Sequence, residues 1–204
     1  MDYLHFLEKE IHTTIMVTVD DKGLPVTCAI DIMDSDKNGL YFLTAKGKNF
    51  YKRLKKQKYI ALTGMKGTNT LSCVAVSVRG KVKEIGAGKL ADLFEKNPYM
   101  AEIYPSEESR NVLTLFYIYE GTGEWFDLSK KPIERETFTF GNTITETTGY
   151  FITDRCNTCG RCKTVCPQQC IDFASKPAVI RQGNCLHCGI CMAVCPMNAI
   201  IRKG

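Results

Sequence analysis

The last fifth of the chain contains two copies of one cysteine pattern. The first copy reads Cys156-Asn-Thr-Cys159-Gly-Arg-Cys162-Lys-Thr-Val-Cys166-Pro167, and the second reads Cys185-Leu-His-Cys188-Gly-Ile-Cys191-Met-Ala-Val-Cys195-Pro196, beginning 29 positions later. Three closely spaced cysteines can hold three irons of one cubane, while the fourth enters a short helix and points toward a second cluster. The pattern therefore predicts two [4Fe–4S] clusters that exchange ligands between the copies.

Each predicted cluster takes three ligands from one copy and its fourth from the other. The first set is Cys156, Cys159, Cys162 and Cys195, and the second set is Cys185, Cys188, Cys191 and Cys166. A zinc site would use four ligands in two pairs and leave half of these cysteines idle. A disulfide framework needs an oxidising compartment, and the first residues show no signal-peptide pattern. We therefore favour clusters over both alternatives.

Residues 150–204 resemble the two-cluster bacterial ferredoxins. The repeat continues beyond the ligands, where Cys170 occupies the position that Ala199 has in the second copy. We interpret Cys170 as a small buried residue and not as a ninth ligand. Ile171 and Ile200 are predicted to cover the clusters with apolar surface. The resemblance implies that this part of the chain carries electrons.

Length and composition leave room for one ordinary domain ahead of the ferredoxin-like part. The chain has 204 residues, of which 44% are hydrophobic and 24% charged, as in globular proteins. We predict a domain over 1–140, a Thr- and Gly-rich linker over 141–149 and the ferredoxin domain over 150–204. No apolar run approaches membrane-spanning length, so no membrane association is expected. The three cysteines outside the ligand sets favour a reducing cytoplasm.

The positive charge of the chain is concentrated at its C-terminal end. Residues 150–204 contain seven lysines and arginines but two acids, whereas the other residues are balanced. Two clusters, each carrying about −2 with its thiolates, would bring this part close to neutral. Nucleic-acid binding is therefore the weaker hypothesis. We expect Arg155, Arg161 and Lys163 to tune the first cluster's potential or to dock an acidic partner.

The N-terminal part alternates with a period of two, which is typical of half-buried strands. After a helix over 2–11, the predicted strands are 13–19, 24–32, 40–44, 59–63, 71–85, 112–119, 124–128 and 133–140. A further short helix is predicted over 88–97, and turns over 21–23 and 34–39. Many short strands with few helices indicate a mainly β fold, an antiparallel barrel. His5 and His12 are expected to be structural or exposed.

A basic, glycine-containing loop lies between the strand that ends at Thr44 and a predicted amphipathic helix with Phe50 and Leu54 facing inward. Amides and ammonium groups converge at such a strand end and helix start, which makes it a workable phosphate site. The alternative is a solvated helix face, since seven positive charges lie between Lys46 and Lys58. The loop alone leaves both open.

The order of these elements, with 39–62 aligning without gaps and 74–85 matching a later strand, resembles the pyridoxamine 5′-phosphate oxidase-like, FMN-binding split-barrel family. That resemblance covers about residues 10–130. It implies a split barrel with FMN at a homodimer interface. It also implies flavin contacts from Thr27, Cys28, Ala29, Leu43 and Thr44, and phosphate contacts from Lys46, Lys48 and Asn49.

Two departures from this family limit what the resemblance implies. The family's basic pair at the start of the helix is Asn49-Phe50 in this chain. The C-terminal substrate-binding segment is replaced by iron–sulfur sequence, with no Arg-x-His pair after Trp125. Pyridoxal phosphate synthesis is therefore not expected, and we interpret Trp125 as a packing residue.

Together these features predict a redox protein that passes electrons between two [4Fe–4S] clusters and FMN. A small molecule would be reduced or oxidised at the flavin, and an external electron-transfer protein would be a partner. The chain would then be an FMN-dependent oxidoreductase in which no side chain stands out as an acid–base catalyst. The alternative is a non-catalytic electron carrier or redox sensor whose barrel serves dimerisation. Another cofactor in the barrel, such as haem or a deazaflavin, also stays open.

Overall fold

The computed structural model describes residues 1–204, which form two compact units. The first unit comprises Met1–Lys66, Ala75–Glu124 and Phe138–Ile144, and the second comprises Gly67–Val74, Trp125–Thr137 and Thr145–Gly204. Two segments from the N-terminal part of the sequence thus cluster with the cysteine-rich part. The predicted domain boundaries stay a prediction, because these units group residues by spatial contacts and are not continuous in the sequence.

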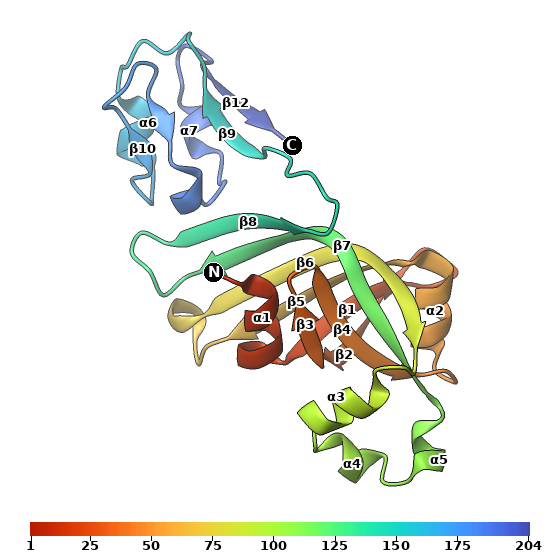
Figure 1. The fold of residues 1–204 in the computed structure, drawn as a ribbon. Helices are drawn as coiled ribbons and strands as arrows, with labels where there is room; N and C mark the ends of the chain where they lie inside the picture. The colour runs from red at the N-terminus through yellow and green to blue at the C-terminus, as the bar shows by residue number, and fades with distance from the viewer. The chain divides into compact units, whose positions relative to one another are not determined.

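The first unit is built on a mixed-length antiparallel sheet (Figure 1). Its strand order is β2-β1-β5-β6-β7-β4-β3, and β8 pairs with β7. The strands are β1 (Thr13–Val19), β2 (Pro25–Asp31), β3 (Asp34–Asp36), β4 (Gly39–Ala45), β5 (Tyr59–Lys66), β6 (Val74–Gly86), β7 (Leu113–Asp127) and β8 (Glu134–Phe140). The predicted fold class is confirmed: a mainly β, antiparallel split barrel followed by a small iron–sulfur domain.

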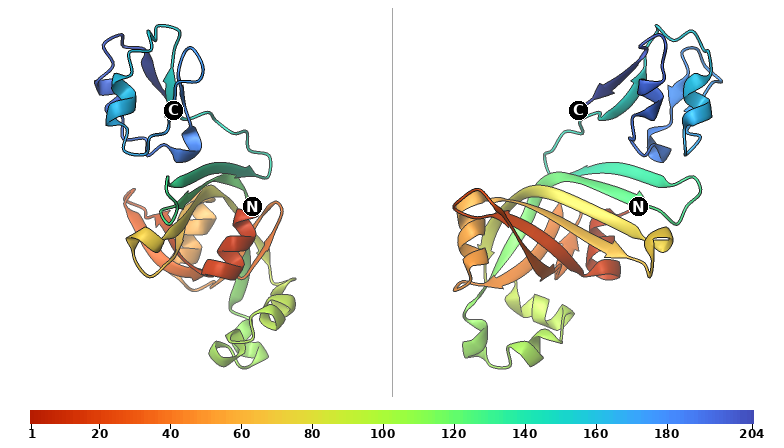
Figure 2. Two further views of the ribbon diagram at one scale, coloured as in Figure 1. Left: turned by 90° about the vertical axis from the view of Figure 1, so that its left-hand side faces the viewer. Right: turned by 180° about the vertical axis from the view of Figure 1, so that it is seen from behind.

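The strands β4 and β7 are covered on both faces, which explains their nearly continuous apolar sequences. On one face Phe42 and Phe116 are register partners, both fully buried, with ring centroids 5.6 Å apart. On the other face Leu113 and Leu115 pack into a cluster with Leu93. That cluster joins the sheet to the helical segment of α3 (Leu90–Lys96), α4 (Met100–Ile103) and α5 (Glu107–Arg110), visible in yellow-green in Figure 2.

The N-terminal helix is shorter and less regular than predicted. Asp2 caps α1 (Tyr3–Phe6) by accepting a hydrogen bond from the amide of His5 at 3.0 Å. A π-helical turn, η1 (Leu7–Ile11), follows and ends at His12. The predicted amphipathic helix is confirmed as α2 (Asn49–Gln57), with Phe50 and Leu54 buried.

The predicted break between the strands 112–119 and 124–128 was wrong. Gly121 and Gly123 do not separate two strands; they lie inside the single long strand β7. A Cβ at Gly121 would stand 2.4 Å from the carbonyl oxygen of Arg79, and one at Gly123 would stand 2.2 Å from the ring of Phe138. These glycines therefore permit close packing of neighbours instead of a reversal. Within the predicted turn 34–39, the short strand β3 forms, because its backbone pairs with β4.

The second unit contains two small antiparallel pairs and two short helices. Strand β9 (Gly149–Ile152) pairs with β12 (Ile200–Lys203), and β10 (Ile171–Asp172) pairs with β11 (Val179–Ile180). The helices α6 (Arg161–Val165) and α7 (Ile190–Ala193) occupy equivalent places in the two sequence copies. Gly160 and Gly189 precede them with φ of 79° and 76°, a left-handed conformation that glycine adopts without strain. No helix of the chain is long and apolar enough to cross a membrane.

Candidate functional site

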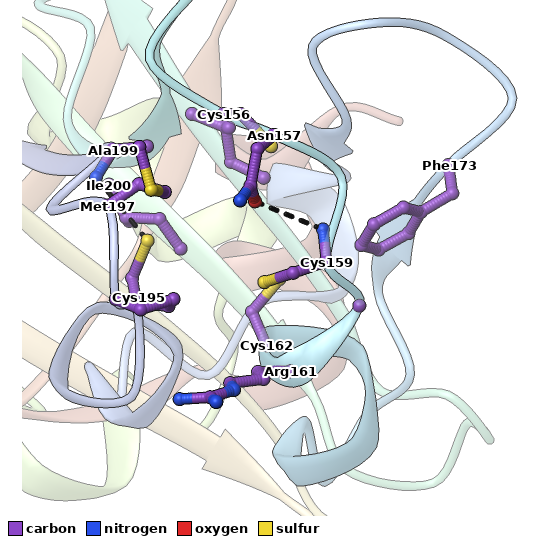
Figure 3. Close-up of a pocket in the computed structure, with 13 residues that line it drawn as sticks. Cys156, Asn157, Cys159, Arg161, Cys162, Phe173, Cys195, Met197, Ala199 and Ile200 are labelled. Carbon is purple, nitrogen blue, oxygen red and sulfur yellow. Dashed lines mark hydrogen bonds between the residues drawn. The ribbon is translucent and has the colours of Figure 1, made fainter.

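The first predicted ligand set lines one cavity of the second unit (Figure 3). Cys156, Cys159 and Cys162 approach it from the loop before α6 and from α6 itself, and Cys195 approaches from the segment after α7. The space between these residues, including the part open to solvent, measures about 320 Å³. Phe173 and Ile200 also line this cavity, so the sulfurs project into mainly apolar surroundings.

The second predicted set lines a separate cavity of the same size. Its cysteines are Cys166, Cys185, Cys188 and Cys191, and Cys170 lies beside them. The fold therefore brings together the two sets that the spacing predicts, each with one cysteine from the other copy. No three histidine, cysteine or acidic side chains converge on a single-ion position. Cluster ligation by these cysteines stays a prediction, because the structure gives the positions of the thiols and not a bound cluster.

Backbone amides turn toward the cysteine sulfurs at equivalent places in the two copies. The amide of Thr158 donates to Cys156 Sγ, and the amide of His187 donates to Cys185 Sγ, both at 3.4 Å. Both donors have positive φ, 58° and 54°, so the two loops share one backbone conformation at this position. Amide donors stabilise thiolate charge and help to set cluster potentials. Thiols, amides and an apolar lining together fit an iron–sulfur cluster.

Burial affects the protonation of two thiols in the second cavity differently. Burial raises the pKa of Cys191 to about 11, so inserting a metal there must displace a proton from sulfur. Burial alone would also raise the pKa of Cys166, but hydrogen bonds from Cys170 and nearby amides outweigh it and lower that pKa. Cys170 Sγ lies 3.5 Å from Cys166 Sγ. Cys170 is therefore in direct contact with a predicted ligand.

Sequence reasoning missed a contact that distinguishes the second cavity from the first. The amide of Ile133, before β8, donates to Gln168 Oε1 at 3.1 Å, and its carbonyl accepts from Asn184 Nδ2 at 2.8 Å. Gln168 follows Cys166-Pro, and Asn184 directly precedes Cys185. The equivalent positions in the repeat are Met197 and Arg155, both exposed. These two mismatches within the repeat were the available signal.

The predicted phosphate contacts lie together on the loop between β4 and α2 in the first unit. Lys46, Lys48 and Asn49 are exposed there. Lys48 is the N-cap of α2, and no side chain caps the helix, so its first amides are open to a ligand. The first turn of α2 carries no acidic residue. The loop therefore offers positive charge and free amide donors, which suit a phosphate.

Lys48 also lies close to the strand that the resemblance assigns to the flavin. Burial raises the pKa of Cys28 in β2, while the positive charges of Arg53 and Lys48 act against that rise. Arg53 lies one turn into α2, and its Nε donates to Thr18 Oγ1 at 2.7 Å. Sequence reasoning did not single out Arg53, because it lies outside the family's usual basic pair. The structure supplies it as a third basic group near Cys28.

The other predicted flavin residues are divided between strand faces. Leu43 packs against the helical cluster of α3 to α5, whereas Thr44 points to the opposite face of β4 and is buried. The hydroxyl Oγ1 of Thr44 has no hydrogen-bond partner, so it is a buried polar atom left for a ligand. Thr27 and Ala29 lie on the exposed face of β2. The structure thus groups Cys28 with Lys48 and separates Leu43 from Thr44.

Fold and site together define a split-barrel protein joined to a unit with two four-cysteine cavities. A profile described as pyridoxamine 5′-phosphate oxidase matches residues 3–126, and one described as a 4Fe-4S dicluster domain matches residues 150–199. The chain belongs to the pyridoxamine 5′-phosphate oxidase family, and the predicted resemblance to both families is confirmed. No curated protein matches the chain significantly.

Solved structures agree with this fold. A NimC/NimA family protein from Clostridium acetobutylicum is 18% identical with a TM-score of 0.56, covering 68% of this chain and 90% of its own. A protein related to general stress protein 26, from the same organism, is 16% identical with a TM-score of 0.52, covering 68% and 91%. A heme binding protein from Mycobacterium smegmatis is 9% identical with a TM-score of 0.52, covering 68% and 57%. At these identities the likeness shows the fold alone.

Proposed function

We propose that this chain is a flavo-iron–sulfur oxidoreductase that passes electrons between two [4Fe–4S] clusters and FMN. The fold and the dicluster domain support a redox or electron-transfer role. The observation that carries the finer proposal is the sorting of eight cysteines into two four-thiol cavities. That sorting occurs in the same chain as a barrel of an FMN-binding family.

Clusters exchange single electrons, whereas a flavin exchanges one or two, so this pair couples a one-electron circuit to two-electron chemistry. In this proposal the two cysteine sets hold the clusters. Lys46, Lys48 and Arg53 bind the phosphate of FMN, and the β2 strand lies against its ring. A small molecule is then reduced or oxidised at the exposed face of that strand.

A homodimer completes the proposed flavin site. The exposed faces of β1 and β5 carry Ile15, Tyr59 and Met65, which are 51%, 48% and 65% exposed. Ala29 of β2, the register partner of Ile15, and Ala61 of β5 are exposed on the same side. Small and apolar side chains on neighbouring strands favour burial against a second copy. We propose that this surface is the dimer interface.

The external partner proposed here is an acidic electron-transfer protein. Arg155, Arg161 and Lys163 are all exposed around the first ligand set, and none forms an ion pair within the chain. Complementary charge speeds and orients such encounters. All eleven cysteines are unpaired, which fits a reducing cytoplasm.

The decisive experiment is anaerobic purification followed by iron, sulfide and acid-released flavin assays. About eight irons and one FMN per chain are expected. About eight irons without flavin, even after FMN is added, would instead favour an electron carrier or redox sensor whose barrel serves dimerisation. Haem or a deazaflavin in the same preparation would redirect the proposal to that cofactor.

A further inference from the structure

Three titratable side chains of the first unit form a hydrogen-bonded chain outside the sites described above. The Tyr99 hydroxyl donates to Asp31 Oδ2 at 2.9 Å, and His12 Nε2 lies 2.8 Å from the same hydroxyl. Tyr99 lies 87 positions after His12, so no local pattern in the sequence predicts this arrangement. The expectation of a structural or exposed His12 did not include this partner.

The direction of each hydrogen bond follows from the proton inventory. A phenol has one proton, and Tyr99 gives it to the Asp31 carboxylate. The hydroxyl oxygen can then only accept from His12, which places a proton on Nε2 of the imidazole. Burial, and then the bond to Asp31, raise the pKa of Tyr99, so its phenol stays protonated at neutral pH. The Tyr99 hydroxyl thus accepts a hydrogen bond from His12 and donates one to Asp31.

The backbone at His12 is strained. Its φ of 63° and ψ of −67° lie in a region that L-residues rarely adopt. Two hydrogen bonds hold it there: its amide donates to the Leu7 carbonyl, and its carbonyl accepts from Ile32, each at 2.8 Å. Strain of this kind concentrates at functional sites. Here it accompanies the approach of the imidazole to Tyr99.

All three residues of this chain are half-buried. The side chains of His12 and Asp31 are 33% and 32% exposed, and Tyr99 is partly buried between them. Asp31 lies on the same face of β2 as Thr27 and Ala29, because alternate residues of a strand share a face. Two residues span about 7 Å along a strand, so Asp31 lies next to the proposed flavin contacts.

We propose that His12, Tyr99 and Asp31 form a proton relay for reductions at the exposed face of β2, with Asp31 as its terminal acid. A proton from solvent enters at His12 Nδ1. The proton on Nε2 passes to the Tyr99 oxygen as the phenolic proton passes to Asp31, which leaves imidazole neutral and Asp31 protonated. Asp31 then gives its proton to the bound molecule and returns to carboxylate. One solvent proton is delivered, which leaves His12 protonated on Nδ1 and the new phenolic proton pointing at Nε2. Rotation of the Tyr99 O–H and proton exchange at the half-exposed imidazole then restore the starting arrangement.

The relay defines a class of substrate. Its products need protons as well as electrons, as when a quinone takes up two electrons and two protons to become a hydroquinone. An acceptor that takes one electron and no proton has no use for the relay. This inference rests on the proposed function, since it takes FMN to be bound beside β2.

The experiment compares two acceptors with the wild-type holoprotein and the Tyr99→Phe variant. Protein reduced anaerobically with dithionite is mixed with menadione, a quinone, or with ferricyanide, which takes one electron and no proton. Tyr99→Phe removes the relay hydroxyl but keeps the edge-on packing of the ring against His12, 5.7 Å between centroids. His12→Asn interrupts the other end. Tyr104→Phe, in the same helical segment, is the matched control.

We expect both relay variants to retain FMN and to reduce ferricyanide at the wild-type rate. Menadione reduction should fall about 100-fold, the scale of a lost general acid, and its solvent deuterium isotope effect should change. Equal rates with menadione, or an equal loss with both acceptors, would overturn the relay while leaving the proposed function intact. A wild-type protein that never retains FMN would overturn both. Tyr104→Phe should match wild type throughout.

Discussion

The two candidate sites of this chain are specified in different ways. The cysteine sets lie within 40 residues of one another, and the repeat that carries them also carries the turns, glycines and helices that aim the sulfurs. The flavin site draws on β2, on the loop after β4 and on α2, which only the whole sheet brings together. A local repeat specifies its site directly, whereas a barrel specifies its site through long-range packing.

Removing one ligand from each set is the strongest test of the first half of this comparison. Cys159→Ala and Cys188→Ala each remove the middle thiol of one set, and each is exposed, so little packing is lost. Each variant should lose about four irons and keep the other cluster's absorption and electron paramagnetic resonance signals. Iron assay and spectroscopy of anaerobically purified protein measure this.

If either substitution removed all the iron, the two cavities would not bind their clusters independently. It would mean that one cluster is needed to form the other. Cys73→Ala, outside both sets, is the control and should keep the wild-type iron content.

The same contrast decides how much the sequence could predict. The grouping of the cysteines follows from local spacing, and the structure gathers each predicted set around one cavity. The helices α6 and α7 contain the third cysteine of each copy and end before the fourth, which was expected inside a short helix. Gly121 and Gly123 misled the strand prediction, because a glycine that ends a strand and one that admits a neighbour look alike in sequence. Leu43 and Thr44 are adjacent in the sequence but lie on opposite faces of β4.

Arg53 and the His12–Tyr99–Asp31 relay could not be predicted for a different reason. Their partners are distant in the chain, and each residue type is common on a protein surface. Packing around the sheet determines which of them meet. The mismatch of Gln168 and Asn184 with the repeat was visible in the sequence, but its partner Ile133 was not.

Substituting the basic groups of the proposed phosphate site tests the second half of the comparison. Charge-assisted hydrogen bonds contribute about 1.5–3 kcal/mol each, so Lys48→Ala and Arg53→Ala should each weaken FMN binding by at least about 10-fold. Fluorescence titration of flavin-depleted protein measures the Kd. Lys52→Ala, an exposed lysine of the same helix, is the control. Equal FMN affinities for all three variants would show that the phosphate does not bind at this loop.

The hydrogen bonds of Ile133 with Gln168 and Asn184 allow a test of whether the second cavity depends on a segment outside the repeat. Gln168→Ala should free the Ile133 amide and raise its hydrogen-exchange rate about 5- to 10-fold, since a net hydrogen bond contributes about 1 kcal/mol. Met197→Ala, at the equivalent repeat position, should leave that rate unchanged. Peptide-resolved hydrogen exchange follows both. Coupling between the second cavity and residues 128–137 acts in both directions. Cys188→Ala, in the second set, should therefore raise hydrogen exchange over 128–137 more than Cys159→Ala, in the first set.

The smallest expected effect concerns Cys170, which breaks the symmetry between the two cavities. It is 2% exposed and touches Cys166, whereas its counterpart Ala199 is fully buried without a thiol. If Cys170 is a packing residue, Cys170→Ala copies the first cavity, keeps about eight irons and lowers the unfolding free energy by about 1 kcal/mol or less. Iron assay and anaerobic urea unfolding measure both quantities. A loss of about four irons would instead make Cys170 a ligand, and the repeat would then no longer predict the second set.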